Sequence, residues 1–172
     1  MLFQRDRFGP SAQVTLEYIY TYTVIRIETK VSLGSLIVEA DNFAAVACWE
    51  PPGAVRRHSV EELEELEKER PIYAAFIRDI EAAKNGFLGE GQQCWQLSLM
   101  ARDPLRTSKG AVRAIIEPFV ERSKEEKVPI WLVAGNERAR DVYAYFGFEV
   151  LKVIYLGEEV RTWCMVCNWP VE

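Results

Sequence analysis

The five residues Ile130 to Ala134 (IWLVA) are apolar without interruption. A strand with one solvated face alternates apolar and polar residues, whereas an unbroken apolar strand is covered on both faces. The segment therefore predicts a buried strand at the centre of a sheet.

Helices and further strands are predicted on both sides of this strand. A strand candidate, Cys94 to Arg102, and a helix, Ala111 to Lys127, come before it, and the helix has its apolar residues at helical spacing. A short helix, Asn136 to Tyr145, and two antiparallel strands, Glu149 to Tyr155 and Thr162 to Asn168, come after it. A parallel crossover followed by an antiparallel pair predicts a mixed sheet with helices on its faces.

The first half of the chain is less regular. Val14 to Lys30 has the β-branched and aromatic content of a strand and the length of a helix, and we favour a helix. Ser35 to Glu39 and Ala44 to Trp49 predict a hairpin. Ser59 to Glu62 has the spacing of a capping box, which begins a helix, and Ile72 to Lys84 is predicted as the next helix.

Composition limits the class of protein. With 172 residues, 49% hydrophobic and 27% charged, the chain is expected to form one globular domain, residues 1–172. Its net charge of -5 and interleaved basic residues argue against nucleic-acid binding. No signal-peptide core or long apolar stretch is present, so we expect a cytoplasmic protein with no membrane segment.

The four cysteines are expected to be ordinary reduced thiols, as is usual in a reducing compartment. Cys164 and Cys167 are three residues apart in a predicted strand. Residues at that spacing point to opposite faces, so a shared metal is not expected, and no metal site is predicted.

Two segments have the residues of a binding site. The loop Arg106 to Gly110 opens a helix, where unpaired N–H groups and the helix dipole bind phosphate. In the pattern Asn136-x-x-Ala139-x-x-x-Tyr143-x-x-x-Gly-Phe, the spacing places Asn136, Ala139, Arg140 and Tyr143 on one face. The phenol of Tyr143 could donate a proton to a leaving thiolate. From spacing alone, we favour the simpler interpretation, in which Tyr143 is a packing aromatic and Asn136 a helix cap.

This pattern, after a buried strand and a strand-loop-helix unit, resembles the GNAT acetyltransferases, over roughly residues 34–168. The segment Ala44 to Gly53 (AAVACWEPPG) is also similar to a segment of fungal GNAT-like proteins. The resemblance implies a mixed α/β (α+β) fold with a mostly antiparallel central sheet flanked by helices. It also implies an enzyme that transfers an acetyl group from acetyl-CoA to an amine within a ternary complex, with a small-molecule or peptide acceptor.

The same resemblance assigns roles to residues. The backbone at the splayed end of the central strand would bind pantetheine. The coenzyme would also be contacted by Asn136, Ala139 and Arg140, and the general acid would be Tyr143. The pyrophosphate loop would follow from Arg106. The coenzyme-binding residues implied at the strand end and in the pyrophosphate loop are Met100, Ala101, Arg102, Arg106, Thr107, Ser108, Lys109, Gly110, Ala111 and Val112.

The chain also departs from the family pattern. Thr107 and Val112 stand where the family has a long polar residue and a small residue, and residues 1–33 are too few for the usual N-terminal strand and helix. This edge is expected to be atypical or truncated. Glu50 is the candidate base, with Glu90 and His58 as alternatives, although a solvated surface carboxylate is the simpler interpretation of Glu50.

These departures leave two other hypotheses. The chain could be a GNAT-fold binding or assembly module that no longer catalyses. It could also be completed at its N-terminal edge by a second copy, in a homodimer.

Overall fold

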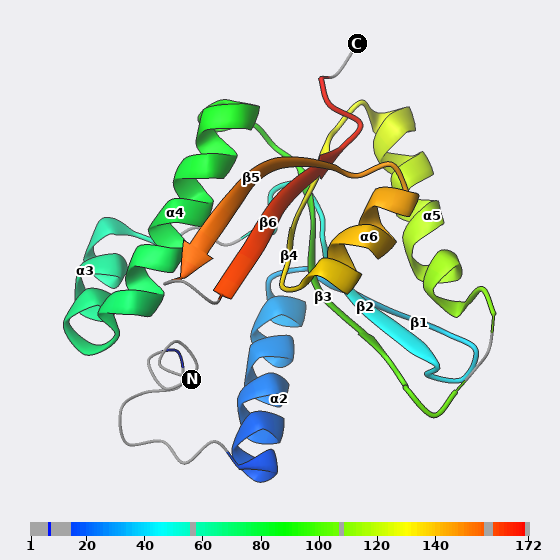
Figure 1. The fold of residues 1–172 in the computed structure, drawn as a ribbon, viewed down its shortest axis with the longest axis horizontal. Coiled ribbons are helices and arrows are strands. Elements are labelled where there is room, and N and C mark those ends of the chain that lie inside the picture. Colours follow the sequence, from blue (N-terminus) through cyan, green and yellow to red (C-terminus); the bar gives the residue numbers. More distant parts are fainter. Residues whose placement is uncertain (1–6, 8–14, 56–57, 107–108, 157–159, 171–172) are drawn as a thin grey trace.

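The computed structural model describes residues 7, 15–55, 58–106, 109–156 and 160–170. Within these residues, six strands form one sheet and five helices surround it (Figure 1). The elements in chain order are α2 (Leu16–Ser32), β1 (Leu36–Ala40), β2 (Ala45–Glu50), α3 (Val60–Glu69), α4 (Pro71–Leu88), β3 (Trp95–Arg102), α5 (Ala111–Glu126), β4 (Ile130–Ala134), α6 (Glu137–Tyr145), β5 (Glu149–Leu156) and β6 (Val160–Cys167).

The sheet has the order β1-β2-β3-β4-β6-β5. Strands β3 and β4 are parallel, and every other neighbouring pair is antiparallel. This arrangement confirms the predicted mixed, mostly antiparallel sheet. Strand β4 is central and buried on both faces, because Ile130 and Leu132 belong to one apolar cluster and Trp131 to the other.

The two apolar clusters lie on opposite faces of the sheet. One lies beneath α5 and α6, and the other beneath α4. Cys164 is in the α4 cluster and Cys167 is in the α5 cluster, so the two thiols face opposite sides, as their spacing predicted. All four cysteines are buried.

Helix α5 is held on the sheet by aromatic packing. Phe119 stacks on Trp49 of β2 with ring centroids 4.4 Å apart and meets the edge of Trp95 of β3 at 5.5 Å. The indole of Trp49 donates to the carbonyl of Ile115 at 3.0 Å. Burying side chains of this size stabilises the fold by about 1.5–3 kcal/mol each, so the start of α5 has a defined position beside β3.

Most predicted boundaries are within two residues of those observed. The segment favoured as a helix is α2, and Ser59 and Glu62 form the predicted capping box of α3. Helix α4 is one turn longer than predicted, because Leu88 is buried in the cluster beneath it and the helix continues to Gly89, at φ +92°.

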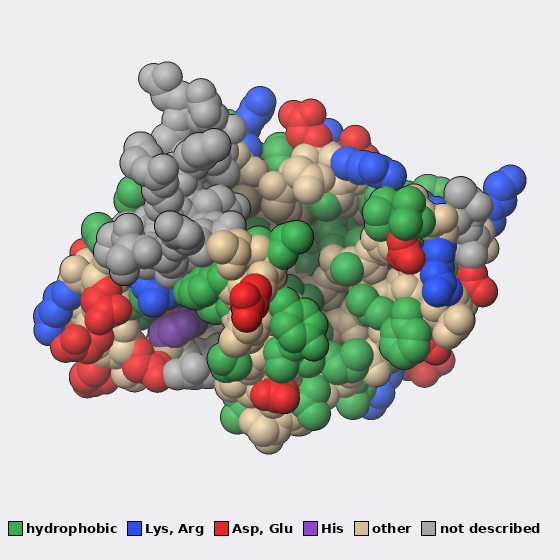
Figure 2. Space-filling view, turned by 90° about the horizontal axis from the view of Figure 1, so that it is seen from below, with side chains coloured by type: hydrophobic (Ala, Val, Ile, Leu, Met, Phe, Trp, Pro, Cys, Tyr) green, Lys and Arg blue, Asp and Glu red, His purple; other side chains and the backbone are tan. Residues whose placement is uncertain are grey.

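Helix α2 differs from the others in its packing. It has no buried residue and extends away from the sheet, and Leu16 and Tyr20 are 86% and 71% exposed. Hydrophobic side chains are prominent on the face seen from below (Figure 2). No helix within the described ranges is long and apolar enough to span a membrane.

Candidate functional site

Strands β3 and β4 separate partway along their length. They pair from Trp95 opposite Ile130 to Leu97 opposite Leu132, and no further. Beyond Leu97, β3 continues to Arg102 paired with β2 alone, while the end of β4 pairs with β6 alone. A wedge-shaped opening between the two parallel strands therefore begins after Leu97.

A bulge at Ser98 determines what faces this opening. Leu97 lies opposite Trp49 and Leu99 opposite Cys48, so Ser98 is an extra residue on β3, and its hydroxyl donates to the Cys48 carbonyl at 3.3 Å. Because of this extra residue, the backbone amides that point toward β2 and those that point toward β4 exchange places in the alternation along β3. Before it, the Trp95 amide donates toward β4, to Pro129 at 2.9 Å.

After the bulge, the amide of Asp103 donates toward β2, to the Ala44 carbonyl at 3.0 Å. Backbone groups alternate along a strand, so the amides of Met100 and Arg102 point away from β2, toward the opening. Two backbone donors thus face a space where no strand pairs with them. An extended ligand that carries amide or carbonyl groups can bind there as an additional strand.

Tyr143 of α6 lies against this part of β3. It is 7% exposed, its ring packs on Phe148 with centroids 5.9 Å apart, and its hydroxyl donates to the Met100 sulfur at 4.0 Å. Burial raises the pKa of Tyr143 to about 12, so the phenol is protonated at neutral pH. The structure therefore brings Tyr143 and Met100 together and gives Tyr143 the packing role that the sequence left open.

Asn136 is the N-cap of α6. Its side-chain oxygen accepts from the Ala139 amide at 2.9 Å, and the residue is exposed just beyond β4. Ala139 packs against the core, whereas the guanidinium of Arg140 lies 5.2 Å from the Trp163 ring centroid and binds Asp141 at 2.7 Å. The capping role considered for Asn136 is thus present, next to the opening.

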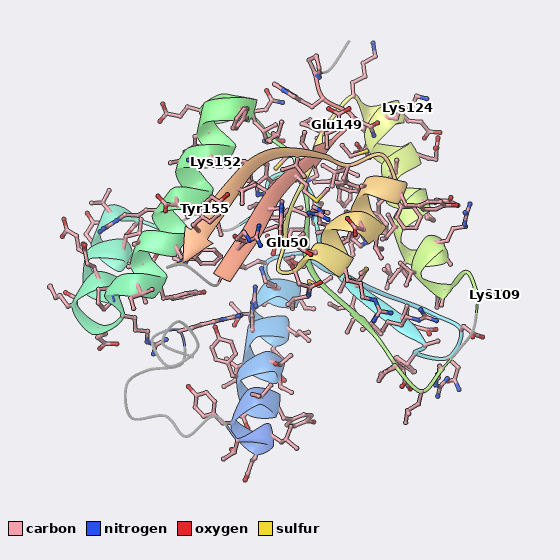
Figure 3. All side chains as sticks on the ribbon, in the orientation of Figure 1. Glu50, Lys109, Lys124, Glu149, Lys152 and Tyr155 are labelled. Carbon is pink, nitrogen blue, oxygen red and sulfur yellow. The ribbon has the colours of Figure 1, made fainter. Side chains whose placement is uncertain are left out.

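The first turn of α5 borders the loop after β3. Its N-cap, Gly110, has φ +94° and no side-chain cap, and Ala111 is buried. Val112 is half-buried and packs against the core cluster. Lys109 is exposed at the periphery of the molecule (Figure 3), and Thr107 and Ser108 lie outside the described residues.

Arg106 is bound to the hairpin turn between β1 and β2. Its guanidinium donates to the carbonyls of Asp41, at 3.3 Å, and Asn42, and pairs with Asp103 at 3.3 Å. Arg102 and Ala101 are exposed. Lys109 is therefore the cation of this loop that extends toward solvent, whereas Arg106 links the loop to the hairpin.

Glu50 is not a surface carboxylate, so that expectation was wrong. It is 2% exposed, forms an ion pair with Lys30 of α2, and accepts from the Gln96 amide at 3.4 Å. Lys84 of α4 donates to the same Gln96 side chain at 2.9 Å. Figure 3 shows Glu50 near the centre of the molecule, where α2 reaches the sheet.

The other candidate bases lie elsewhere. Glu90 is exposed in the loop before β3, and His58 contacts Glu81 at 3.0 Å beside α3 and α4. Lys30, Lys84 and Gln96 were missed by the sequence analysis. No local pattern signals them, because their partners are 12 to 46 residues away in the chain.

The fold has similar solved structures. One is described as histone acetyltransferase HPA2 and related acetyltransferase, from Corynebacterium glutamicum, with a TM-score of 0.59 and 16% identity over 93% of this chain and 78% of that chain. Another is arylalkylamine N-acetyltransferase 2 from Aedes aegypti, with a TM-score of 0.58 and 13% identity over 96% and 85%. The chain has the GNAT fold, which confirms the resemblance seen in its sequence.

Sequence relatives come from fungi. An uncharacterized N-acetyltransferase of Schizosaccharomyces pombe is 26% identical over 154 residues, which are 83% of this chain and 59% of the relative. An uncharacterized protein of Saccharomyces cerevisiae is 30% identical over 124 residues, 71% of this chain and 50% of the relative. The chain spans about half the length of the curated relatives it matches. No protein-family model matches it.

Proposed function

We propose that the chain is an N-acetyltransferase that uses acetyl-CoA as co-substrate. The observation that carries the proposal is the opening after Leu97, where the amides of Met100 and Arg102 face a space without a partner strand. The pantetheine arm of coenzyme A is extended and contains amide groups, so it can pair with these donors as a strand does.

The start of α5 supports a place for the pyrophosphate. The amides of its first turn and the positive end of the helix dipole favour a phosphate, and Gly110 supplies the left-handed backbone that begins the helix without a side chain over the turn. Because Val112 packs against the core, its bulk is directed away from the loop. The steric objection that Val112 raised in the sequence is therefore weaker in the structure.

In the proposed reaction, a neutral amine attacks the thioester carbonyl carbon, the N–C bond forms, and the C–S bond breaks to release coenzyme A thiolate. The proton that the new amide nitrogen loses goes to this thiolate, so the products are the amide and the free thiol of coenzyme A. The amides of β3 would stabilise the oxyanion, and Tyr143, whose hydroxyl already donates to a sulfur atom, would donate to the thiolate. A thiol has a pKa of about 8.5. With its pKa raised to about 12, Tyr143 would act by hydrogen bonding while keeping its proton.

Calorimetric titration with acetyl-CoA tests the coenzyme site. We expect binding, and we expect Lys109→Gln to weaken it roughly three- to tenfold, which is the effect of losing one exposed charge contact with a phosphate. Lys124→Gln is the matched control, because Lys124 is also an exposed lysine but lies in the last turn of α5, at the opposite end of the helix from Lys109 (Figure 3). No binding at millimolar acetyl-CoA would contradict the proposal.

The second candidate function is a binding or assembly module without catalysis. It is favoured by one observation: Arg106, Asn136 and Tyr143 all have structural partners within the chain. In that case, the unmodified chain should not bind acetyl-CoA, and Val112→Gly should create binding. Micromolar binding by the unmodified chain would contradict this alternative.

A further inference from the structure

A half-buried lysine amine lies near the closed end of the opening. Lys30, in the last turn of α2, forms its ion pair with Glu50 where the lysine side chain is 18% exposed and the carboxylate side chain 3% exposed. The Gln96 amide is the second donor to this carboxylate, at 3.4 Å. Removing charges from water is costly, so an ion pair with a buried carboxylate is weak evidence for a role in stability alone.

The register of the sheet places this pair beside the apex of the opening. Glu50 lies opposite Gln96, and Gln96 directly precedes Leu97, the last β3 residue that pairs with β4. At about 3.3 Å per residue, Gln96 is about 7 Å along the strand from the Ser98 bulge. The Lys30 amine is thus within a few residues' length of the point where the strands separate.

The pair lies on the face of the sheet opposite Tyr143. Trp49 and Leu97 belong to the cluster beneath α5 and α6, which also contains Tyr143. Glu50 and Gln96 follow and precede these residues, so their side chains point to the other face, where they meet α2 and α4. A thioester held between β3 and β4 would have the Tyr143 hydroxyl on one side and the Lys30 amine on the other.

We propose that Lys30 is an internal acetyl acceptor, modified by acetyl-CoA bound in the opening; this inference rests on the proposed function. Glu50 takes a proton from the Lys30 ammonium, the neutral amine attacks the carbonyl carbon, the N–C bond forms, and the C–S bond breaks. The leaving thiolate accepts the Tyr143 hydrogen bond and gains the proton that the new amide nitrogen loses. The products are acetyl-Lys30, the free thiol of coenzyme A, and one proton released from Glu50 to solvent.

The surrounding contacts distinguish Lys30 from Lys84, which belongs to the same group of polar side chains. Lys84 donates to the neutral side-chain oxygen of Gln96, whereas Lys30 contacts a carboxylate that can accept a proton. Acetylation would remove the charge of Lys30 and leave Glu50 buried without its cation. Because α2 has no buried residue, the modification would weaken its attachment to the sheet.

The experiment incubates the purified full chain with acetyl-CoA and follows each lysine by peptide mass spectrometry. We expect Lys30 to be acetylated at least tenfold faster than Lys84 and the exposed Lys68. Excess desulfo-coenzyme A should suppress the modification of Lys30 only. Glu50→Gln should slow it at least tenfold while coenzyme affinity is unchanged, and Lys84→Arg should leave it unchanged.

Lys30→Arg keeps the positive charge and the ion pair, so it keeps the test valid even if Glu50→Gln does not fold. It should abolish the fast incorporation of one acetyl group per chain. A chain that binds acetyl-CoA but modifies Lys30 no faster than Lys68 would overturn the inference and leave the proposed function standing. A chain that does not bind acetyl-CoA would contradict the proposed function itself.

Discussion

At the scale of single residues, Tyr143 shows how one side chain can serve both the fold and the proposed chemistry. It is buried against Phe148, and its hydroxyl reaches the Met100 sulfur across the α5 side of the sheet. A hydrogen bond from a phenol to a thioether sulfur 4.0 Å away is weak. The hydroxyl therefore contributes little to stability, and its removal tests chemistry rather than folding.

For Tyr143→Phe we expect the melting temperature and the acetyl-CoA affinity to be nearly unchanged, and turnover with an amine acceptor to fall at least roughly tenfold. Steady-state kinetics and thermal unfolding measure these effects. Tyr145→Phe is the control, because Tyr145 lies on the same helix, is 69% exposed, and contacts Arg113. Equal turnover of the two variants would contradict the role of Tyr143.

Glu50 illustrates a residue whose environment depends on distant partners. It ends an apolar strand next to a proline, a place where a carboxylate is usually solvated. In the structure, Lys30 of α2 and Gln96 of β3 cover it from 20 and 46 residues away. Its burial is therefore a consequence of how α2 meets the sheet.

At the scale of elements, β3 and α2 contrast in how firmly they are held. Strand β3 has neighbours on both sides up to Leu97, and one extra residue, Ser98, turns two of its amides toward the opening. Helix α2 has no buried residue, whereas α5 buries five, among them Ile115, Ile116 and Phe119. Few buried contacts mean a low free energy of local opening.

Hydrogen exchange of the isolated chain should therefore separate the helices. We expect the amides of α2 to exchange at least about a hundredfold faster than those in the middle of α5, because only the latter require opening of the core. Mass spectrometry at peptide resolution measures both in one sample, and α3, another helix with no buried residue, is the internal reference. Protection of α2 equal to that of α5 would contradict this expectation.

At the scale of the whole molecule, buried ionisable groups set the response of stability to pH. Burial raises the pKa of the Cys164 thiol from 9.0 to about 12 and that of Cys167 to about 11. Burial also raises the pKa of Tyr143 from 10.0 to about 12, and that of Tyr73. In the unfolded chain, these groups lose their protons at lower pH than in the folded chain.

The free energy of unfolding should thus be independent of these thiols below pH 9 and fall as the pH rises toward 11 and 12, by about 1.4 kcal/mol per pH unit for each thiol. Urea unfolding at about pH 8 and about pH 10.5 measures this loss. Cys164→Ala should be less stable than the unmodified chain at the lower pH, because it leaves a small cavity. Its free energy of unfolding should, however, fall less between the lower and the higher pH. An equal loss in both proteins would contradict a buried, protonated Cys164.

The elements with local signals could be predicted from the sequence alone. The apolar run of β4, the helical spacing of α5 and the capping box at Ser59 depend on residues a few positions apart, and each matches the structure. The pattern from Asn136 to Phe148, which lies within one short segment, also indicated the GNAT fold. For Asn136 and Tyr143, the sequence suggested both a structural and a chemical role, and the structure shows the structural one.

Tertiary structure decided the features that depend on register and on contacts distant in sequence. The Ser98 bulge that aims the Met100 and Arg102 amides, the attachment of Arg106 to the hairpin turn, and the burial of Glu50 beneath Lys30 have no local signature. Each arises because strands and helices far apart in the chain pack on the same core, which selects one register and one set of neighbours. Short-range periodicity and capping therefore determined which elements form, and long-range packing determined which side chains meet at the opening.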